Sequence, residues 1–68
     1  MKTKFPERLK ELREDVGLGQ DALGRAIGVS KGTISLWENG LRDPKLSNLI
    51  RLAKFFDVSL DYLAGLED

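Results

Sequence analysis

The side chains able to do chemistry in this chain are cations, carboxylates, hydroxyls and amides, since its 68 residues include no histidine and no cysteine. These absences remove the commonest general base, the commonest metal ligand and every thiolate nucleophile. Among the remaining side chains, the cations bind anions, and the hydroxyls and amides hydrogen-bond to polar groups. We therefore expect a binding domain that is not an enzyme and needs no cofactor or small-molecule ligand. Four acidic residues lack the spacing of a calcium loop, so we expect no metal site at Asp57, Asp61, Glu67 or Asp68.

Residues 20–40, QDALGRAIGVSKGTISLWENG, carry the candidate binding chemistry. Two short helical patterns, about 20–27 and 31–39, flank a tight turn at Gly28. Ser30 is placed to cap the second of these helices. Ile34 and Trp37 form the buried side of that helix, and Thr33 is partly covered. Its other side carries a lysine, a hydroxyl and two small or apolar residues: Lys31, Gly32, Ser35 and Leu36.

Three further helical patterns must position this segment. Phe5, Leu9, Leu12 and Val16 form one apolar stripe of a helix ending near Asp15. The charged residues between them, Arg8 among them, are expected on a solvated face. A fourth helix spans about 47–56, and a fifth, capped by Ser59, ends at Leu63 or Ala64.

The expected core follows from the inner sides of these helices. The second helix should bury Leu23, Ala26 and Ile27, and Gly24 should allow the next helix to pass close over it. The inner side of the fourth helix should be Leu46, Leu49, Ile50, Ala53 and Phe56. Five helices without an alternating stretch predict one compact all-α domain over residues 1–68.

The charge balance gives no general affinity for nucleic acid, since 11 basic and 11 acidic residues cancel. Residues 19–45 carry four basic and three acidic side chains, so any electrostatic binding depends on local placement. No apolar run reaches the roughly 18 residues of a membrane span, and no signal-peptide pattern opens the chain. We expect a cytoplasmic protein, bacterial or phage-encoded.

Residues 20–40 resemble the Cro/phage-repressor helix-turn-helix family, also called lambda-repressor-like or xenobiotic-response-element-type regulators. The resemblance rests on Gln20, Leu23, the turn Gly28-Val29-Ser30, Thr33-Ile34-Ser35 and Trp37-Glu38-Asn39-Gly40. It extends over nearly the whole chain through Arg8 to Arg13, Gly17-Leu18, Leu52 to Lys54 and Val58 to Leu63. The family's fold is a compact five-helix DNA-binding domain. The resemblance thus implies a sequence-specific transcriptional regulator, a repressor, that binds double-stranded DNA.

The resemblance also implies residue roles. Gln20 would bond a backbone phosphate and support the start of the third helix, and Arg13 and Glu38 would form a partly buried ion pair. The third helix would face the major groove with Lys31, Gly32, Thr33, Ser35 and Leu36. Asn39 and Arg42 would contact the phosphate backbone on the far side.

Three positions depart from the family pattern. Gly19 replaces the usual hydroxyl cap before Gln20, Gly32 offers no side chain to a base, and Leu36 is apolar where a polar side chain is common. Leu36 can contact a thymine methyl, and Gly32 can allow close approach of the backbone to DNA. These departures and the zero net charge leave an alternative: a protein-interaction module with the same fold and little affinity for DNA.

A single copy of such a domain contacts only a few base pairs. We therefore expect a homodimer on a two-fold operator with half-sites about 10 bp apart. Apolar area beyond the needs of the core lies near the C-terminal end, and we expect the dimer surface at Leu60, Tyr62 and Leu66.

Overall fold

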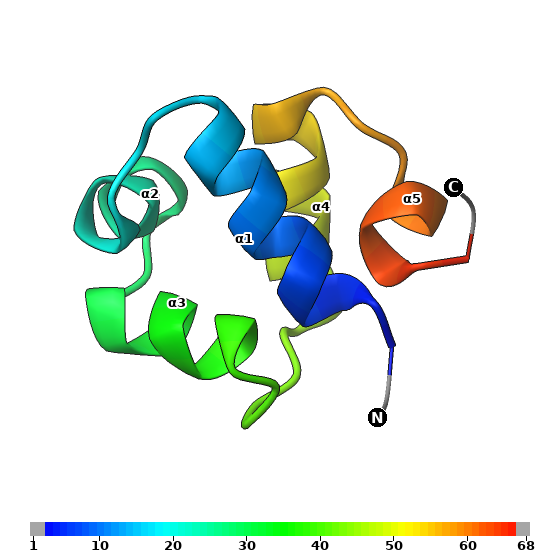
Figure 1. Cartoon of the computed structure of the whole chain (residues 1–68), viewed down its shortest axis with the longest axis horizontal. Coiled ribbons are helices and arrows are strands. Elements are labelled where there is room, and N and C mark those ends of the chain that lie inside the picture. Colours follow the sequence, from blue (N-terminus) through cyan, green and yellow to red (C-terminus); the bar gives the residue numbers. More distant parts are fainter. Residues whose placement is uncertain (1–2, 67–68) are drawn as a thin grey trace.

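The computed structural model describes residues 3–66 and shows five helices and no strand within them. The helices are α1 (Phe5–Asp15), α2 (Gln20–Ile27), α3 (Lys31–Glu38), α4 (Leu46–Phe56) and α5 (Leu60–Ala64). α1 runs through the middle of the molecule, with α2 and α3 to one side and α5 at the other end (Figure 1). The predicted all-α architecture is confirmed. The third helix ends one residue earlier than expected, and the fourth begins one residue earlier.

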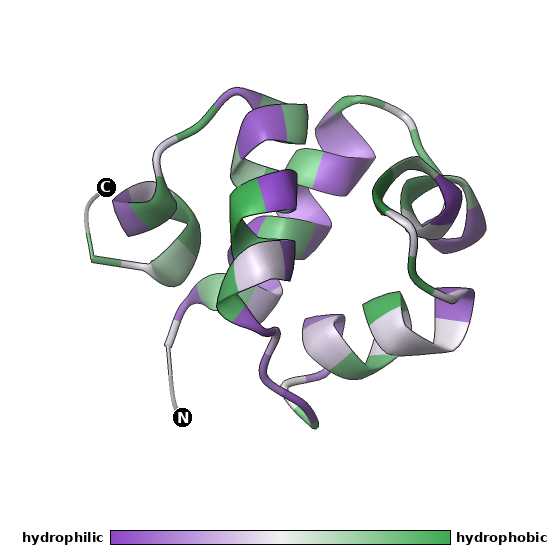
Figure 2. Ribbon diagram, turned by 180° about the vertical axis from the view of Figure 1, so that it is seen from behind, coloured by the Kyte–Doolittle hydropathy of each residue, from purple (hydrophilic) through white to green (hydrophobic). Residues whose placement is uncertain are grey.

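All five helices contribute side chains to one core. Its largest fully buried side chains are those of Trp37, Leu9, Leu23, Ile34, Leu52 and Leu63. The ring of Phe5 meets that of Trp37 edge to face, with centroids 6.4 Å apart. Trp37 is therefore a packing residue, as its spacing from Ile34 predicts. Figure 2 shows hydrophobic and hydrophilic segments alternating around the helices, as amphipathic helices require.

Two of the expected apolar contacts in the first half of the chain are wrong. Val16 is 57% exposed because α1 ends at Asp15, and Val16 no longer continues the helical stripe. Ala26 is exposed because the buried side of α2 is formed by Leu23, Gly24 and Ile27, and Ala26 lies beside that stripe.

α4 is also rotated relative to the expectation. Leu46 and Ile50 are exposed, at 65% and 37%, while Leu52 is fully buried. Leu49 and Phe56 pack against the core as expected. An i, i+4 pair of large apolar side chains on α4 thus faces solvent.

Arg8 was expected on a solvated face, and this expectation is also wrong. Its side chain is only 8% exposed. Its guanidinium lies 4.2 Å from the centroid of the Tyr62 ring, and Nη1 donates a 2.5 Å hydrogen bond to the Tyr62 carbonyl. Arg8 therefore joins α1 to α5. Its place three residues after Phe5 and four before Leu12 is the sequence signal that could have predicted this burial.

None of the helices within residues 3–66 is long and apolar enough to cross a membrane.

Candidate nucleic-acid interface

α3 begins at a capped N-terminus. Ser30 has an extended backbone, and its Oγ accepts a 3.1 Å hydrogen bond from the Thr33 amide. The hydroxyls of Ser30 and Thr33 also lie 3.0 Å apart. Thr33 therefore takes part in the cap, and its position is set by the first turn of α3.

A close approach of backbone to backbone sets the turn between α2 and α3. Gly28 has φ of 83°, a conformation that glycine adopts at little cost, and it ends α2. A Cβ at Gly24 would lie 2.5 Å from the Val29 carbonyl oxygen and 3.2 Å from the Ser30 carbonyl carbon. Gly24 does permit a close approach, as expected, but its nearest neighbours belong to the turn and not to α3.

The C-terminal end of α3 is held by a network centred on Glu38. Arg13 donates from Nε to Glu38 Oε2 at 2.6 Å and from Nη2 to Oε1 at 2.9 Å. The two side chains are 11% and 4% exposed. Arg13 Nη1 also donates to the Leu18 carbonyl at 2.8 Å. The hydrogen bonds to Glu38 raise the pKa of Arg13, against the opposing effect of burial.

Gln20 belongs to the same network. Its Nε2 donates to Glu38 Oε1 at 3.1 Å, so Gln20 supports the end of α3. The resemblance implied support for the start of this helix, and that expectation is wrong. Gln20 is also the first residue of α2, whose N-cap Gly19 provides no side-chain hydrogen bond. The N-terminus of α2 thus lies next to the C-terminus of α3 with amide donors that no side chain caps.

The face of α3 away from the core carries the remaining predicted contact residues. Lys31, Gly32, Asn39 and Arg42 are exposed, and Thr33, Ser35, Leu36 and Gln20 are half-buried. Asn39 Nδ2 donates to the Ser35 carbonyl at 2.9 Å and lies 3.3 Å from the Ser35 Oγ. Lys31 and Arg42 have no ion-pair partner within residues 3–66. No acidic side chain belongs to this set of eight residues.

Gly32 has no role in the packing of the chain. A Cβ there would meet only the Ser30 Oγ, at 3.8 Å, and the residue is not among those with positive φ. Lys31 does not stabilise α3 electrostatically, because a cation in the first turn of a helix interacts unfavourably with the helix dipole. The packing of the chain and the helix dipole therefore favour neither residue type at its position.

The predicted dimer surface is partly available. Leu60 and Leu66 are 39% and 77% exposed. Tyr62 is half-buried, and Arg8 covers part of its ring. Leu60 shares a shallow groove with Ile50, which the sequence analysis had assigned to the core.

Comparison with known proteins identifies the arrangement. A family model described as helix-turn-helix matches residues 9–63. The chain belongs to this helix-turn-helix family. The resemblance to phage repressors and the five-helix fold that it implies are thereby confirmed.

Phage and bacterial regulators of this helix-turn-helix family are similar to the chain. The repressor protein C2 of Salmonella phage P22 is 40% identical over 57 residues, which cover 84% of this chain and 26% of that protein. A crystal structure of the P22 c2 repressor in complex with a synthetic operator aligns with a TM-score of 0.88 at 34% identity, covering 98% of this chain and 100% of that one. The HTH-type transcriptional regulator YobD of Bacillus subtilis (strain 168) is 37% identical over 64 residues, or 94% of this chain and 57% of YobD.

The chain spans between about a quarter and somewhat more than half of the length of these curated relatives. The same fold also occurs as one part of an enzyme. Hydroxypropylphosphonic acid epoxidase from S. wedmorenis aligns with a TM-score of 0.80 at 35% identity, over 91% of this chain and 33% of the epoxidase. Family membership therefore describes the domain, and its function must be argued from its own residues.

Proposed function

We propose that this helix-turn-helix domain binds double-stranded DNA as part of a transcriptional repressor, with α3 in the major groove. The observation that carries the proposal is the position of α3. Its first turn is capped by Ser30, and its last residue, Glu38, is bonded to Arg13 on α1. The eight predicted contact residues include two cations without an ion-pair partner among residues 3–66 and no acidic residue. A rigid helix with such a face suits the groove of a polyanion.

Phosphate contacts would provide most of the affinity. Lys31 and Arg42 lie at opposite ends of the α3 segment, which suits contacts to two stretches of the backbone. Beside the C-terminal end of α3, the N-terminus of α2 at Gln20, where the N-cap Gly19 makes no side-chain hydrogen bond, offers amide donors and a partial positive charge to a phosphate. Lys31, Thr33 and Ser35 can also reach base edges, and Leu36 can contact a thymine methyl.

Fluorescence anisotropy with labelled duplexes tests the proposal. Binding should weaken steeply with salt, and operators selected from random DNA should bind more tightly than unselected duplexes. Lys31→Ala should weaken binding and lower the slope of log K against log salt by about 1 if Lys31 contacts a phosphate. Lys10→Ala, which removes an exposed lysine on α1, is the matched control and should leave the slope unchanged. No duplex binding at low salt would refute the proposal.

We further propose that the domain acts as a homodimer on a two-fold operator, in the cytoplasm where such DNA lies. The exposed apolar side chains of Ile50 and Leu60 line one groove, and Leu46 extends the same face of α4. This surface overlaps the predicted set Leu60, Tyr62 and Leu66, of which Tyr62 offers the least free area. Leu60→Glu should abolish any dimer seen by sedimentation equilibrium and should reduce cooperativity on two half-sites, while Leu41→Glu, at another exposed leucine, should leave the self-association unchanged.

The alternative is a protein-interaction module of the same fold, favoured by the zero net charge. The surroundings of Gly32 argue against it. A module without a DNA ligand would lose nothing by having alanine there, since no atom of residues 3–66 crowds the position. Glycine is useful if the α3 backbone must approach another molecule closely. The proposed domain itself catalyses no reaction.

A further inference from the structure

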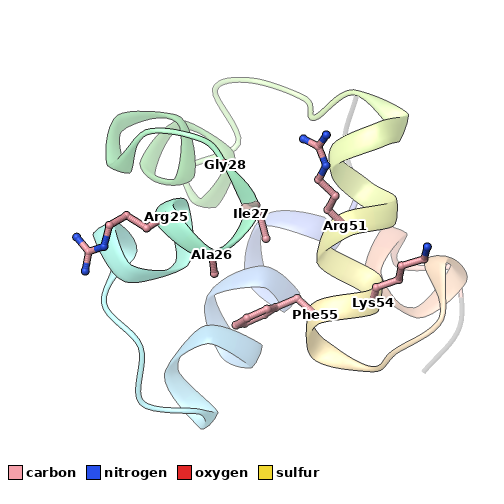
Figure 3. Close-up of a pocket in the computed structure, with 7 residues that line it drawn as sticks. All are labelled: Arg25, Ala26, Ile27, Gly28, Arg51, Lys54 and Phe55. Atoms are coloured by element: carbon pink, nitrogen blue, oxygen red, sulfur yellow. The ribbon is translucent and has the colours of Figure 1, made fainter.

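A groove lies between the last turn of α2 and the middle of α4, away from every residue proposed to contact DNA. Figure 3 shows the side chains that line it. None of them comes from α3, and the groove is open to solvent. Apart from Gly28, which ends α2, the lining consists of Arg25, Ala26, Ile27, Arg51, Lys54 and Phe55.

The floor of the groove is apolar. Phe55 is 44% exposed, although exposing a phenylalanine side chain to water costs free energy. Its ring contacts that of Phe56 edge to face, with centroids 5.1 Å apart and an interplanar angle of 85°. Phe56 packs against the core, so Phe55 contacts a ring that belongs to the body of the domain. Ala26 is also exposed, and the two side chains extend toward the same space from facing helices (Figure 3).

The rim of the groove is basic. Arg25 lies on the α2 side, with its guanidinium extending outward from the groove, and Arg51 and Lys54 lie on the α4 side, with the Lys54 amine extending away from Phe55 (Figure 3). These two α4 residues are the only basic ones after Lys45, in a segment that also holds four acidic residues. Within the part of the chain that the structure describes, no acidic residue lines the groove. Lys54 has no ion-pair partner within residues 3–66, and Arg51 donates only to the neutral Asn48 side chain there, at 3.3 Å.

The partial neutralisation of Arg25 is weak. Its Nη1 lies 3.6 Å from Asp21 Oδ2, and the two side chains are 75% and 61% exposed. Such an exposed pair is screened by water and salt. The rim therefore keeps a positive potential over an apolar floor.

The basic rim and the apolar floor together indicate which kind of molecule can bind in the groove. A DNA phosphate would pair with the cations but gain nothing from Phe55. A second copy facing the groove with its own groove would bring a second set of cations, and like charges would meet. An amphipathic helix with carboxylates beside a row of apolar side chains satisfies both the rim and the floor.

We propose that the groove between α2 and α4 binds an acidic amphipathic helix of a partner protein. The apolar side of that helix packs on Phe55 and Ala26, and its carboxylates pair with Arg51 and Lys54. Because the groove shares no residue with the α3 face, the partner and DNA occupy separate surfaces. This binding does not depend on the proposed affinity for DNA.

Two-dimensional NMR of the ¹⁵N-labelled chain tests the proposal with synthetic peptides. The probe is an amphipathic helical peptide with leucine on one face and glutamate on the other, compared with the same peptide carrying lysine in place of glutamate. The glutamate peptide should shift the amide signals of Ala26, Gly28, Arg51, Lys54 and Phe55 in a saturable way. The lysine peptide should leave them unchanged.

Variants separate the contributions of charge and apolar contact. Lys54→Glu should lower the affinity for the glutamate peptide by about tenfold, and Phe55→Ser should lower it by a similar factor. The matched controls are Lys10→Glu on α1 and Val16→Ser at another exposed apolar position, and neither should change the affinity. Lys54→Glu keeps the test valid even if Phe55→Ser fails to fold, because the Lys54 side chain is exposed and makes no ion pair within residues 3–66.

Several results would overturn the proposal. Equal binding of both peptides, shifts centred on α3, or an affinity unchanged by Lys54→Glu would each do so. Polyglutamate binding as tightly as the amphipathic peptide would show that the apolar floor has no role. Duplex DNA that shifts the groove signals in place of those of α3 would assign these cations to phosphate.

Discussion

Arg13 on α1 and Glu38 on α3 are joined by two hydrogen bonds of 2.6 and 2.9 Å, although 25 residues separate them in the sequence. Both side chains are almost entirely covered. The pair therefore determines the angle at which α3, the proposed recognition helix, leaves the body of the domain. Gln20 adds a third hydrogen bond to the same carboxylate, so α2 is tied to this point as well.

Loss of one partner of this pair should be more damaging than loss of both. Glu38→Ala leaves the buried Arg13 guanidinium unpaired and should lower the free energy of unfolding by about 3 kcal/mol. That is a large part of the roughly 5 kcal/mol typical of a small domain. The double variant Arg13→Met/Glu38→Leu should cost less than the sum of the two single changes. Urea denaturation of all three variants measures this, and additive losses would contradict the coupling.

The ion pair should also be insensitive to alkaline pH. Its hydrogen bonds to Glu38 raise the pKa of Arg13 in the folded state. A basic group with a raised pKa contributes stability that is complete below its unfolded pKa and disappears only as pH rises through the folded value. The stability difference between wild type and Arg13→Met should thus stay constant from about pH 7 to about pH 10. A difference that shrinks in this range would contradict the direction of the shift.

Alanine at two helical glycines should have opposite effects. At Gly24 the added Cβ would meet the Val29 carbonyl oxygen at 2.5 Å, so Gly24→Ala should destabilise the fold by about 2 kcal/mol. At Gly32 the space is open, and Gly32→Ala should stabilise it by about 0.5 kcal/mol through helix propensity. The same Gly32→Ala change should weaken DNA binding if the α3 backbone approaches the bases. Thermal denaturation and anisotropy titrations of the two variants measure these effects, and a destabilised Gly32→Ala would show that the packing at α3 has been misjudged.

Arg8 should be needed to keep α5 in place. Arg8→Ala removes the donor to the Tyr62 carbonyl and the cation over its ring, and should cost about 2 kcal/mol. Amide hydrogen exchange should increase first at Leu63, the buried residue of α5. Tyr62→Phe is the matched control, since it keeps both the ring and the carbonyl. Unchanged exchange in α5 of Arg8→Ala would exclude this role for Arg8.

The cap of α3 should contribute separately from the Glu38 network. Ser30→Ala removes the acceptor for the Thr33 amide and should lower stability by about 1 kcal/mol, while Ser30→Asn should restore most of it. Ser47→Ala, at an exposed serine in the first turn of α4, serves as the control and should be near neutral. Urea denaturation gives the differences. Equal losses at Ser30 and Ser47 would indicate a general effect of removing serine.

The sequence by itself determined the five helices, the turn at Gly28 and the burial of Trp37. Each of these depends on neighbours a few residues apart: apolar spacing, a capping hydroxyl and a glycine able to adopt positive φ. The resemblance to phage repressors added the Arg13–Glu38 pair, because that pattern covers nearly the whole chain.

Only the tertiary structure decided where the buried stripe of α1, α2 and α4 ends, since that boundary depends on the elements packed against each helix. Ile50 and Phe55 are of residue types usually found in the core, yet both are exposed on α4. Ile50 belongs to the surface proposed for self-association, and Phe55 to the groove proposed for a partner. Arg8 shows the reverse, because an arginine is buried only where a distant carbonyl and ring, here those of Tyr62, replace its water. Gln20 was expected to support the start of α3 and lies at its end, because the folded arrangement of α2 and α3 places the first residue of α2 beside Glu38, the last residue of α3.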